Sequence, residues 1–154
     1  MRGSGGRRPR RQGSGAERVE LCGDLLEGGT TPSRGMIRQA RTIAGIGLHV
    51  IVRPRGGDFL FDEDEFAVMQ ADIDTARAEG ADGVVIGLLT ADGAVDAART
   101  RDLIARARPI SVTFHRAFDM TPDPFEALGD SGRARRRPRA HLRPGGEPCW
   151  RGCR

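Results

Sequence analysis

Side chains suited to acid–base chemistry and anion binding gather where three predicted strands end. They are Glu20 in "VELC", Arg53 and Arg55 in "VRPRGGD", and His115, Arg116 and Asp119 in "TFHRAFD". Imidazole and carboxylate groups transfer protons, and guanidinium groups bind carboxylates and phosphates. The pattern therefore predicts proton-transfer roles for Glu20, His115 and Asp119, and substrate-binding roles for Arg53, Arg55 and Arg116.

The same residues also fit a purely structural role. Arg53 and Arg116 can brace carboxylates such as Asp58 in an ion network, and Glu20 fits a buried carboxylate paired with an arginine. The segment "RPRGGDF" is rich in glycine but lacks the spacing of a Walker loop or a dinucleotide fingerprint, so it does not favour a phosphate loop. Anion chemistry and an ion network both remain open from the residues alone.

A unit made of a short apolar run and a helical pattern recurs four times between residues 17 and 128. The predicted strands are 18–22, 48–54, 83–90 and 110–119, and the predicted helices are 36–45, 62–80, 94–108 and a fourth that begins in "PDPFEAL" at 122–128. Alternating units of this kind indicate parallel strands joined by right-handed crossovers. The fold class is α/β, and the periodicity fits both an open doubly wound sheet and part of a (β/α)₈ barrel.

Apolar residues at helical spacing predict which face of each helix is buried. The expected faces are Met36, Ile37, Ala40 and Ile43 in the first helix, Phe66, Met69, Ile73 and Ala76 in the second, and Val95, Ala98, Leu103 and Ile104 in the third.

The net charge of +4 conceals an acidic middle between two basic ends. Residues 17–128 carry a charge of −7, while residues 1–16 hold five arginines and no acidic residue. All 25 basic residues are arginine, and the chain has one tryptophan, no tyrosine and no motif for base reading. We therefore do not expect nucleic acid as a partner.

The chain contains three cysteines, Cys22, Cys149 and Cys153, without the regular spacing of a secreted disulfide framework. It lacks both a signal peptide and an apolar run of the roughly 20 residues that span a bilayer. We expect a cytoplasmic protein that does not contact the membrane. A thiolate at Cys22 could hold Cu(I) if a second soft donor joined it.

Four segments together resemble the CutC family of copper homeostasis proteins over about residues 15–128. They are "RVELCGDLLEGGTTPSRGMI", "VIVRPRGGDFLFDEDEFAVMQADI", "GADGVVIGLLTADGAVD" and "VTFHRAFDMTPDPFEAL". The resemblance implies a cytoplasmic (β/α)₈ barrel, of which this chain retains about four units. It also implies Cu(I) binding through cysteines, one of which matches Cys22. The other belongs to a first strand that this chain lacks.

The polar pocket implied by the resemblance maps onto Glu20, Arg53, His115, Arg116 and Asp119. This pocket looks more like an enzyme site for a small anion than a copper chaperone site, although no reaction follows from it. Copper homeostasis, an enzyme of unknown reaction and a non-functional fragment therefore all remain open.

The ends of the chain depart from the family pattern. We divide the chain into a basic tail at 1–15, a partial barrel at 16–128 and an arginine-rich tail at 129–154. Codons for "RARRRPRAHLRP" can be chosen so that the frame shifted by one base reads "ALGVDRVLTSG", which resembles the next family segment. We infer a reading frame lost between Leu128 and Arg133. A half barrel with open sheet edges should also self-associate.

Overall fold

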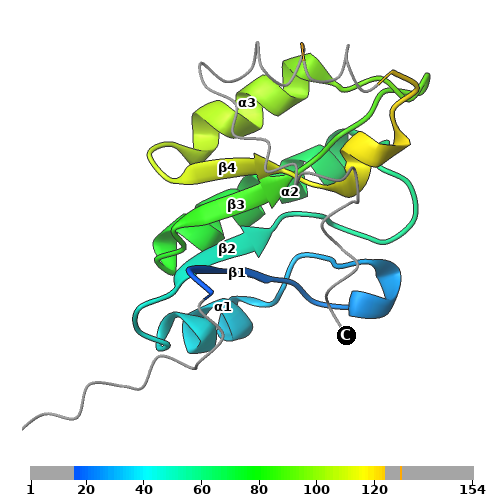
Figure 1. Cartoon of the computed structure of the whole chain (residues 1–154). Coiled ribbons are helices and arrows are strands. Elements are labelled where there is room, and N and C mark those ends of the chain that lie inside the picture. The colour runs from blue at the N-terminus through cyan, green and yellow to red at the C-terminus, as the bar shows by residue number, and fades with distance from the viewer. Residues whose placement is uncertain (1–15, 124–128, 130–154) are drawn as a thin grey trace, which may run out of the picture.

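Four parallel strands form one sheet in the computed structural model, which describes residues 16–123 and 129. The strands are β1 (Arg18–Leu21), β2 (Gly47–Ile51), β3 (Gly83–Ile86) and β4 (Ser111–Phe114), in the order β1-β2-β3-β4 (Figure 1). All three pairings are parallel. The predicted tails lie outside the described residues, except for Gly129. The fourth predicted helix also lies outside them, apart from Pro122 and Asp123.

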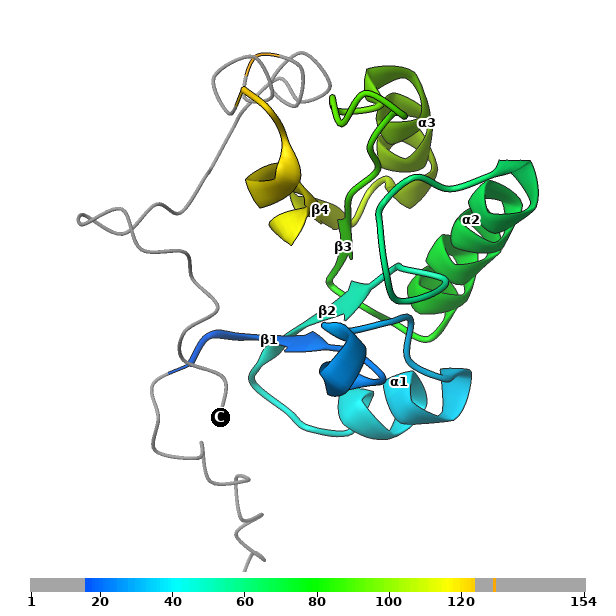
Figure 2. The ribbon, with the colours of Figure 1, turned by 90° about the vertical axis from the view of Figure 1, so that its right-hand side faces the viewer.

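Three helices connect the strands and cover one face of the sheet. They are α1 (Arg34–Arg41), α2 (Glu63–Ala78) and α3 (Ala97–Ala107), and Figure 2 shows them side by side along that face. Two short 3₁₀ helices, η1 (Leu25–Glu27) and η2 (Arg116–Met120), follow β1 and β4. Helices on one face only, over a curved sheet in sequential order, fit a barrel segment and not a doubly wound sheet. The prediction of a partial (β/α)₈ barrel is confirmed.

The core lies between the sheet and the helices. Alternate strand residues point into it, so Leu48, Val50 and Val52 of the β2 segment pack with Val84 and Ile86 of β3. Helix α2 contributes the four buried residues predicted for it, Phe66, Met69, Ile73 and Ala76. Burial of each large apolar side chain contributes about 1.5–3 kcal/mol, which is what holds the helices in place on the sheet.

The other two helices differ from the predicted pattern. Helix α1 buries Ile37, whereas Met36 is exposed and Ile43 lies beyond the last helical residue, Arg41. Helix α3 buries Thr100, Leu103 and Ala107. Ala98 is exposed in that helix, and Val95 is buried ahead of it in the loop. The buried faces of both helices were predicted from apolar residues alone. In α3 the buried positions are spaced by three and four residues, but they begin at the polar residue Thr100.

The start of α2 also fixes the loop that precedes it. Asp62 accepts a hydrogen bond from the Glu65 backbone, and Glu65 accepts one from the Asp62 backbone, which forms a capping box. Acidic residues in this first turn stabilise the positive end of the helix. Because Glu65 also binds Arg55, the box ties the loop between β2 and α2 to the helix.

None of the helices within the described residues has the length and apolar character needed to cross a membrane.

Candidate anion-binding site

Arg53 follows β2 and is almost fully buried, with 2% of its surface exposed. Its Nη1 donates hydrogen bonds to the carbonyls of Glu27 (2.7 Å) and Gly29 (3.1 Å), and its Nη2 donates to the carbonyl of Gly57 (2.7 Å). Its Nε is enclosed and has no hydrogen-bond acceptor among the described residues. Three of its five N–H groups therefore have acceptors, and a bidentate contact with a ligand would use the Nε–H and the remaining Nη2–H.

His115 caps the N-terminus of η2 at the end of β4. Its Nδ1 accepts a hydrogen bond from the Ala117 backbone (3.2 Å), so the proton of the neutral ring sits on Nε2. Nε2 is enclosed without a partner in the described part of the chain. Burial, followed by the charges of Arg53 and Arg116, lowers the pKa of His115 to about 3. His115 is therefore a neutral hydrogen-bond donor near neutral pH.

A glycine directly after β3 makes room for the His115 ring. A Cβ atom at Gly87 would lie 2.4 Å from Cε1 and 2.5 Å from Nδ1 of His115. Any side chain at this position would displace the imidazole. Gly87 thus helps to position His115, although a glycine within an apolar strand gives no such indication in the sequence.

Phe59 lies among the three basic side chains. Its ring centre is 5.0 Å from the centre of the His115 ring, 4.8 Å from Cζ of Arg53 and 6.0 Å from Cζ of Arg116. Cations stack favourably on aromatic faces, which explains why the ring is held there. Sequence reasoning missed Phe59. The available signal was a phenylalanine close to two arginines in "RPRGGDF".

Arg116 is the exposed cation of the site. Its guanidinium packs against Gly28, where a Cβ atom would lie 2.5 Å from Nη1. Gly28 has a φ of 81°, which favours glycine, so the backbone conformation and the close contact agree. No hydrogen bond joins the Arg116 side chain to another described residue. Arg116 thus keeps the full guanidinium geometry that binds an oxyanion with two hydrogen bonds.

These side chains form a positive site with enclosed donors. Burial and then the nearby charge of Arg116 lower the pKa of Arg53, whereas the opposing effects of Glu27 and Asp58 are smaller. A buried donor without an acceptor typically costs about 1–3 kcal/mol, so two such donors on side chains that both contact Phe59 call for an explanation. An oxyanion would satisfy both donors and the charge.

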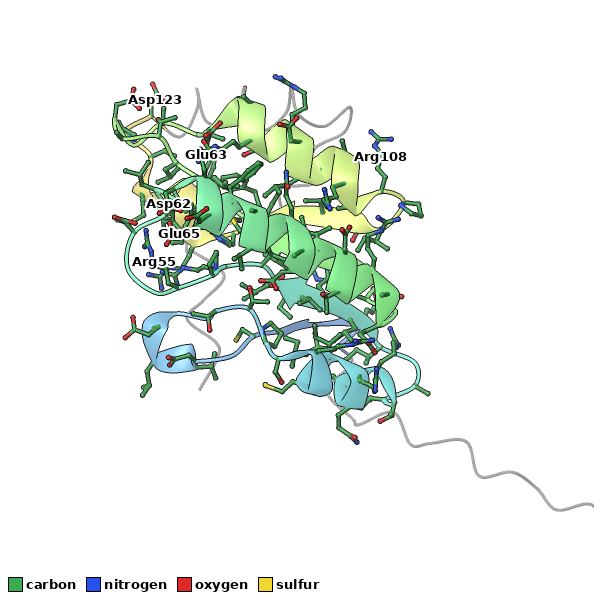
Figure 3. All side chains as sticks on the ribbon, turned by 180° about the vertical axis from the view of Figure 1, so that it is seen from behind. Arg55, Asp62, Glu63, Glu65, Arg108 and Asp123 are labelled. Atoms are coloured by element: carbon green, nitrogen blue, oxygen red, sulfur yellow. The ribbon has the colours of Figure 1, made fainter. Side chains whose placement is uncertain are left out.

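Arg55 belongs to an ion network and not to this site. It binds Glu65 and Asp58 and donates to the Leu60 carbonyl (2.8 Å), with its guanidinium over the Phe61 ring. Figure 3 shows it beside the labelled Asp62 and Glu65 at one end of α2. The hydrogen bond that Arg55 donates to Glu65 is the main cause that raises the pKa of Arg55. Arg55, predicted to bind substrate, is thus engaged by two carboxylates.

Glu20 and Asp119, predicted as proton-transfer groups, are both exposed. Glu20 pairs with Arg18 on the same strand (2.9 Å), and not with His115. In the sheet register Glu20 is level with His49 of β2, on the face away from the helices. Asp119 lies in η2, three residues after Arg116. The structure therefore brings together Arg53, His115 and Arg116 of the six predicted residues.

Cys22, the predicted copper ligand, follows β1 and is half-buried. A Cβ atom at Gly29 would lie 3.4 Å from its sulfur. Cys149 and Cys153 lie outside the described residues. Within the described ranges no group of three or more His, Cys, Asp and Glu side chains could hold a metal ion. The donor set on these residues does not fit a resident copper centre.

The face away from the helices holds a second polar pair that sequence reasoning missed. Nε2 of His49 in β2 lies 3.3 Å from Oγ of Ser111 in β4, and Gly83 of β3 leaves room between them. His49 alternates with core residues in "LHVIV", so its place on the opposite face could have been read from the period of two. It lies at the other end of the strands from His115.

Comparisons with known proteins point to one family. The model of the CutC family matches residues 8–131. A family protein CutC from Chromobacterium violaceum is 59% identical over 119 residues, which cover 77% of this chain and 48% of that protein. The mouse copper homeostasis protein cutC homolog is 54% identical over 114 residues, 74% of this chain and 42% of that protein.

A solved structure shows the same fold. The CutC protein of Streptococcus agalactiae aligns with a TM-score of 0.71 and 36% sequence identity, over 74% of this chain and 57% of that one. The chain spans about half the length of the curated relatives that it matches.

Proposed function

The chain belongs to the CutC family, and on this premise we propose that it acts in copper homeostasis as a cytoplasmic barrel protein that binds a small oxyanion. Relatives from mouse and human carry the name copper homeostasis protein. The oxyanion part rests on one observation: the enclosed donors of Arg53 and His115 lie beside Phe59 with the exposed guanidinium of Arg116. Barrels place their ligand sites at this end of the strands.

Calorimetric titration with inorganic phosphate and with acetate tests this site. Arg116→Gln should weaken the binding of the preferred anion about tenfold or more, since one charged hydrogen-bonding group is lost. Arg108→Gln is the matched control, because Arg108 lies at the opposite end of the sheet (Figure 3). The proposal is wrong if neither anion binds, or if the two variants bind equally well.

An enzyme acting on a small anion is a second use of the same site. The neutral His115, enclosed beside two arginines, favours it, because a fixed N–H donor can polarise a substrate oxygen. We retain Glu20 and Asp119 as the proposed proton-transfer groups. Any metabolite that stabilises the protein against heat should lose this effect in His115→Ala, and turnover of that metabolite should fall in Glu20→Gln and Asp119→Asn. Turnover that survives both substitutions would exclude these roles.

Cu(I) binding by Cys22 is a separate proposal, with copper as cargo. A thiolate is the protein ligand that Cu(I) prefers, and Cys22 lies on the loop that also contacts Arg53. Titration with Cu(I) against a chelator should show weaker binding for Cys22→Ala than for the wild type. The double variant Cys149→Ala/Cys153→Ala is the control and should bind as the wild type does. Unchanged binding in Cys22→Ala excludes the site.

A further inference from the structure

Phe59 packs against two side chains that each carry an enclosed N–H group without an acceptor in the described part of the chain. Arg53 Nε and His115 Nε2 are both enclosed without an acceptor among the described residues, and the Phe59 ring packs against both side chains. The ring is itself buried, with 3% of its surface exposed. The ring therefore contacts both side chains that carry these N–H groups without an acceptor in the described ranges.

Arg53 keeps its Nε–H and one Nη2–H for a ligand, and the neutral ring of His115 keeps its Nε2–H. The terminal nitrogens of Arg53 bind three backbone carbonyls, and Nδ1 of His115 accepts from Ala117. The charged groups that act on His115 are Arg53 from the β2 end and Arg116 from η2. None of the described carboxylates is hydrogen-bonded to the His115 ring. The electrostatic surroundings therefore favour an anionic acceptor over a water molecule or a cation.

A pocket lies next to the Phe59 side chain. An open cavity of about 250 Å³ at the protein surface borders Phe59, and its lining includes Leu60, Leu89 and Met120 together with the polar Asp58 and Thr90. An apolar cavity of about 150 Å³ is large enough for a benzene molecule. The Phe59 backbone is held in place, since its carbonyl accepts a hydrogen bond from the Leu89 N–H (2.9 Å). A rotation of the side chain would leave this backbone hydrogen bond in place.

We propose that Phe59 is the gate of the oxyanion site: its ring rotates into this cavity, and one oxygen of a carboxylate or phosphate takes the N–H groups of Arg53 and His115. Arg116 binds the remaining oxygens. The inference rests on the proposed function and adds the ligand class, the two donors and the side chain that must move. It makes His115 a hydrogen-bond donor to the ligand and not a base.

Binding of inorganic phosphate to gate variants tests the movement. Phe59→Leu removes the competing ring, so phosphate should bind about threefold to tenfold more tightly than in the wild type. Phe61→Leu is the matched control, because Phe61 is equally buried but stacks on Arg55. Its phosphate affinity should equal that of the wild type. Equal affinities in Phe59→Leu and the wild type, or a gain in both variants, would overturn the gate.

Two further variants test the donor. Glutamine can place an N–H near the Nε2 position, so His115→Gln should keep phosphate affinity within about threefold, whereas His115→Phe should lose at least about tenfold. Similar losses in both variants would overturn the donor role. Nitrogen NMR of the ligand-free protein provides an independent check. The proton of His115 should remain on Nε2 between about pH 5 and 8, and a proton on Nδ1 would contradict the assignment.

The outcomes separate the two proposals. If phosphate and acetate bind neither the wild type nor Phe59→Leu, the proposed function fails and the gate fails with it. If an anion binds and Arg116→Gln weakens it, but Phe59→Leu changes nothing, the gate alone is wrong.

Discussion

At the scale of single residues, His115 shows how much the surroundings of a side chain decide. Its position after an apolar strand predicted a functional role, and the usual assumption for such a histidine is proton transfer. The hydrogen bond from Ala117 and the enclosure of Nε2 instead make it a donor. The sequence identifies the residue, but its tautomer depends on a backbone N–H that only the folded η2 places.

His115 should make folding stability depend on pH. The pKa of His115 is about 3 in the folded protein, whereas an ordinary histidine has a pKa of 6.5. As pH falls, the unfolded chain therefore takes up the proton first. The free energy of unfolding should therefore decrease below about pH 6.5, by about 1 kcal/mol per pH unit. In His115→Gln this component disappears. Urea unfolding of both proteins at about pH 7 and pH 5 measures the difference, and parallel losses would contradict the assignment.

At the scale of elements, one carboxylate joins α1 to the end of α2. Glu79 accepts hydrogen bonds from Arg34 and from Arg38 (3.0 Å), and these bonds lower the pKa of Glu79 to about 2. The sequence predicted both helices but not this link, because the partners lie about 40 residues apart. The buried face of α2 was predicted fully, because its apolar spacing, its acidic first turn and the glycine after it all indicate the same helix. Helix α1 buries only Ile37, so its apolar residues were a poor guide to its buried face.

Glu79→Gln tests the link through pH. A carboxylate with a lowered pKa stabilises the fold above its ordinary pKa of 4.5, and this stabilisation is lost as pH falls toward 2. The variant should be less stable than the wild type near pH 6, and the difference should shrink steadily as the solution is acidified. Asp102→Asn, an exposed change on α3, should show no such trend. Thermal unfolding followed by circular dichroism measures it, and a constant difference would show that the charge is not involved.

At the scale of the whole molecule, the sheet of the described residues has β1 and β4 as its edge strands. Within the described ranges β1 and β4 each pair with one neighbour only, and apolar side chains such as Val19 and Leu26 are exposed. Unpaired parallel edges and exposed apolar groups favour association. We expect the purified chain to sediment as oligomers that grow with concentration. A single monomeric species with a sharp thermal transition would contradict this expectation.

The arginine-rich segment after Leu128 yields a prediction about the gene. We propose that the reading frame changes between Leu128 and Arg133, because a shifted frame can encode a family-like strand. Sequencing the DNA should reveal "ALGVDRVLTSG" or a close variant in the alternate frame. If the alternate frame encodes no sequence similar to the family, the frameshift hypothesis is wrong and the segment is an ordinary basic tail.

Arg53 also links two loops of the protein. Its three hydrogen bonds reach Glu27 and Gly29 on the loop after β1, and Gly57 on the loop after β2. If either loop left the sheet, the Arg53 guanidinium would become exposed or would stay buried without its hydrogen-bond acceptors. The two loops should therefore open as one cooperative unit, so that their amide protons exchange with solvent at a common rate. An anion bound beside Arg53 would slow that exchange in both loops together, including in the one it does not touch.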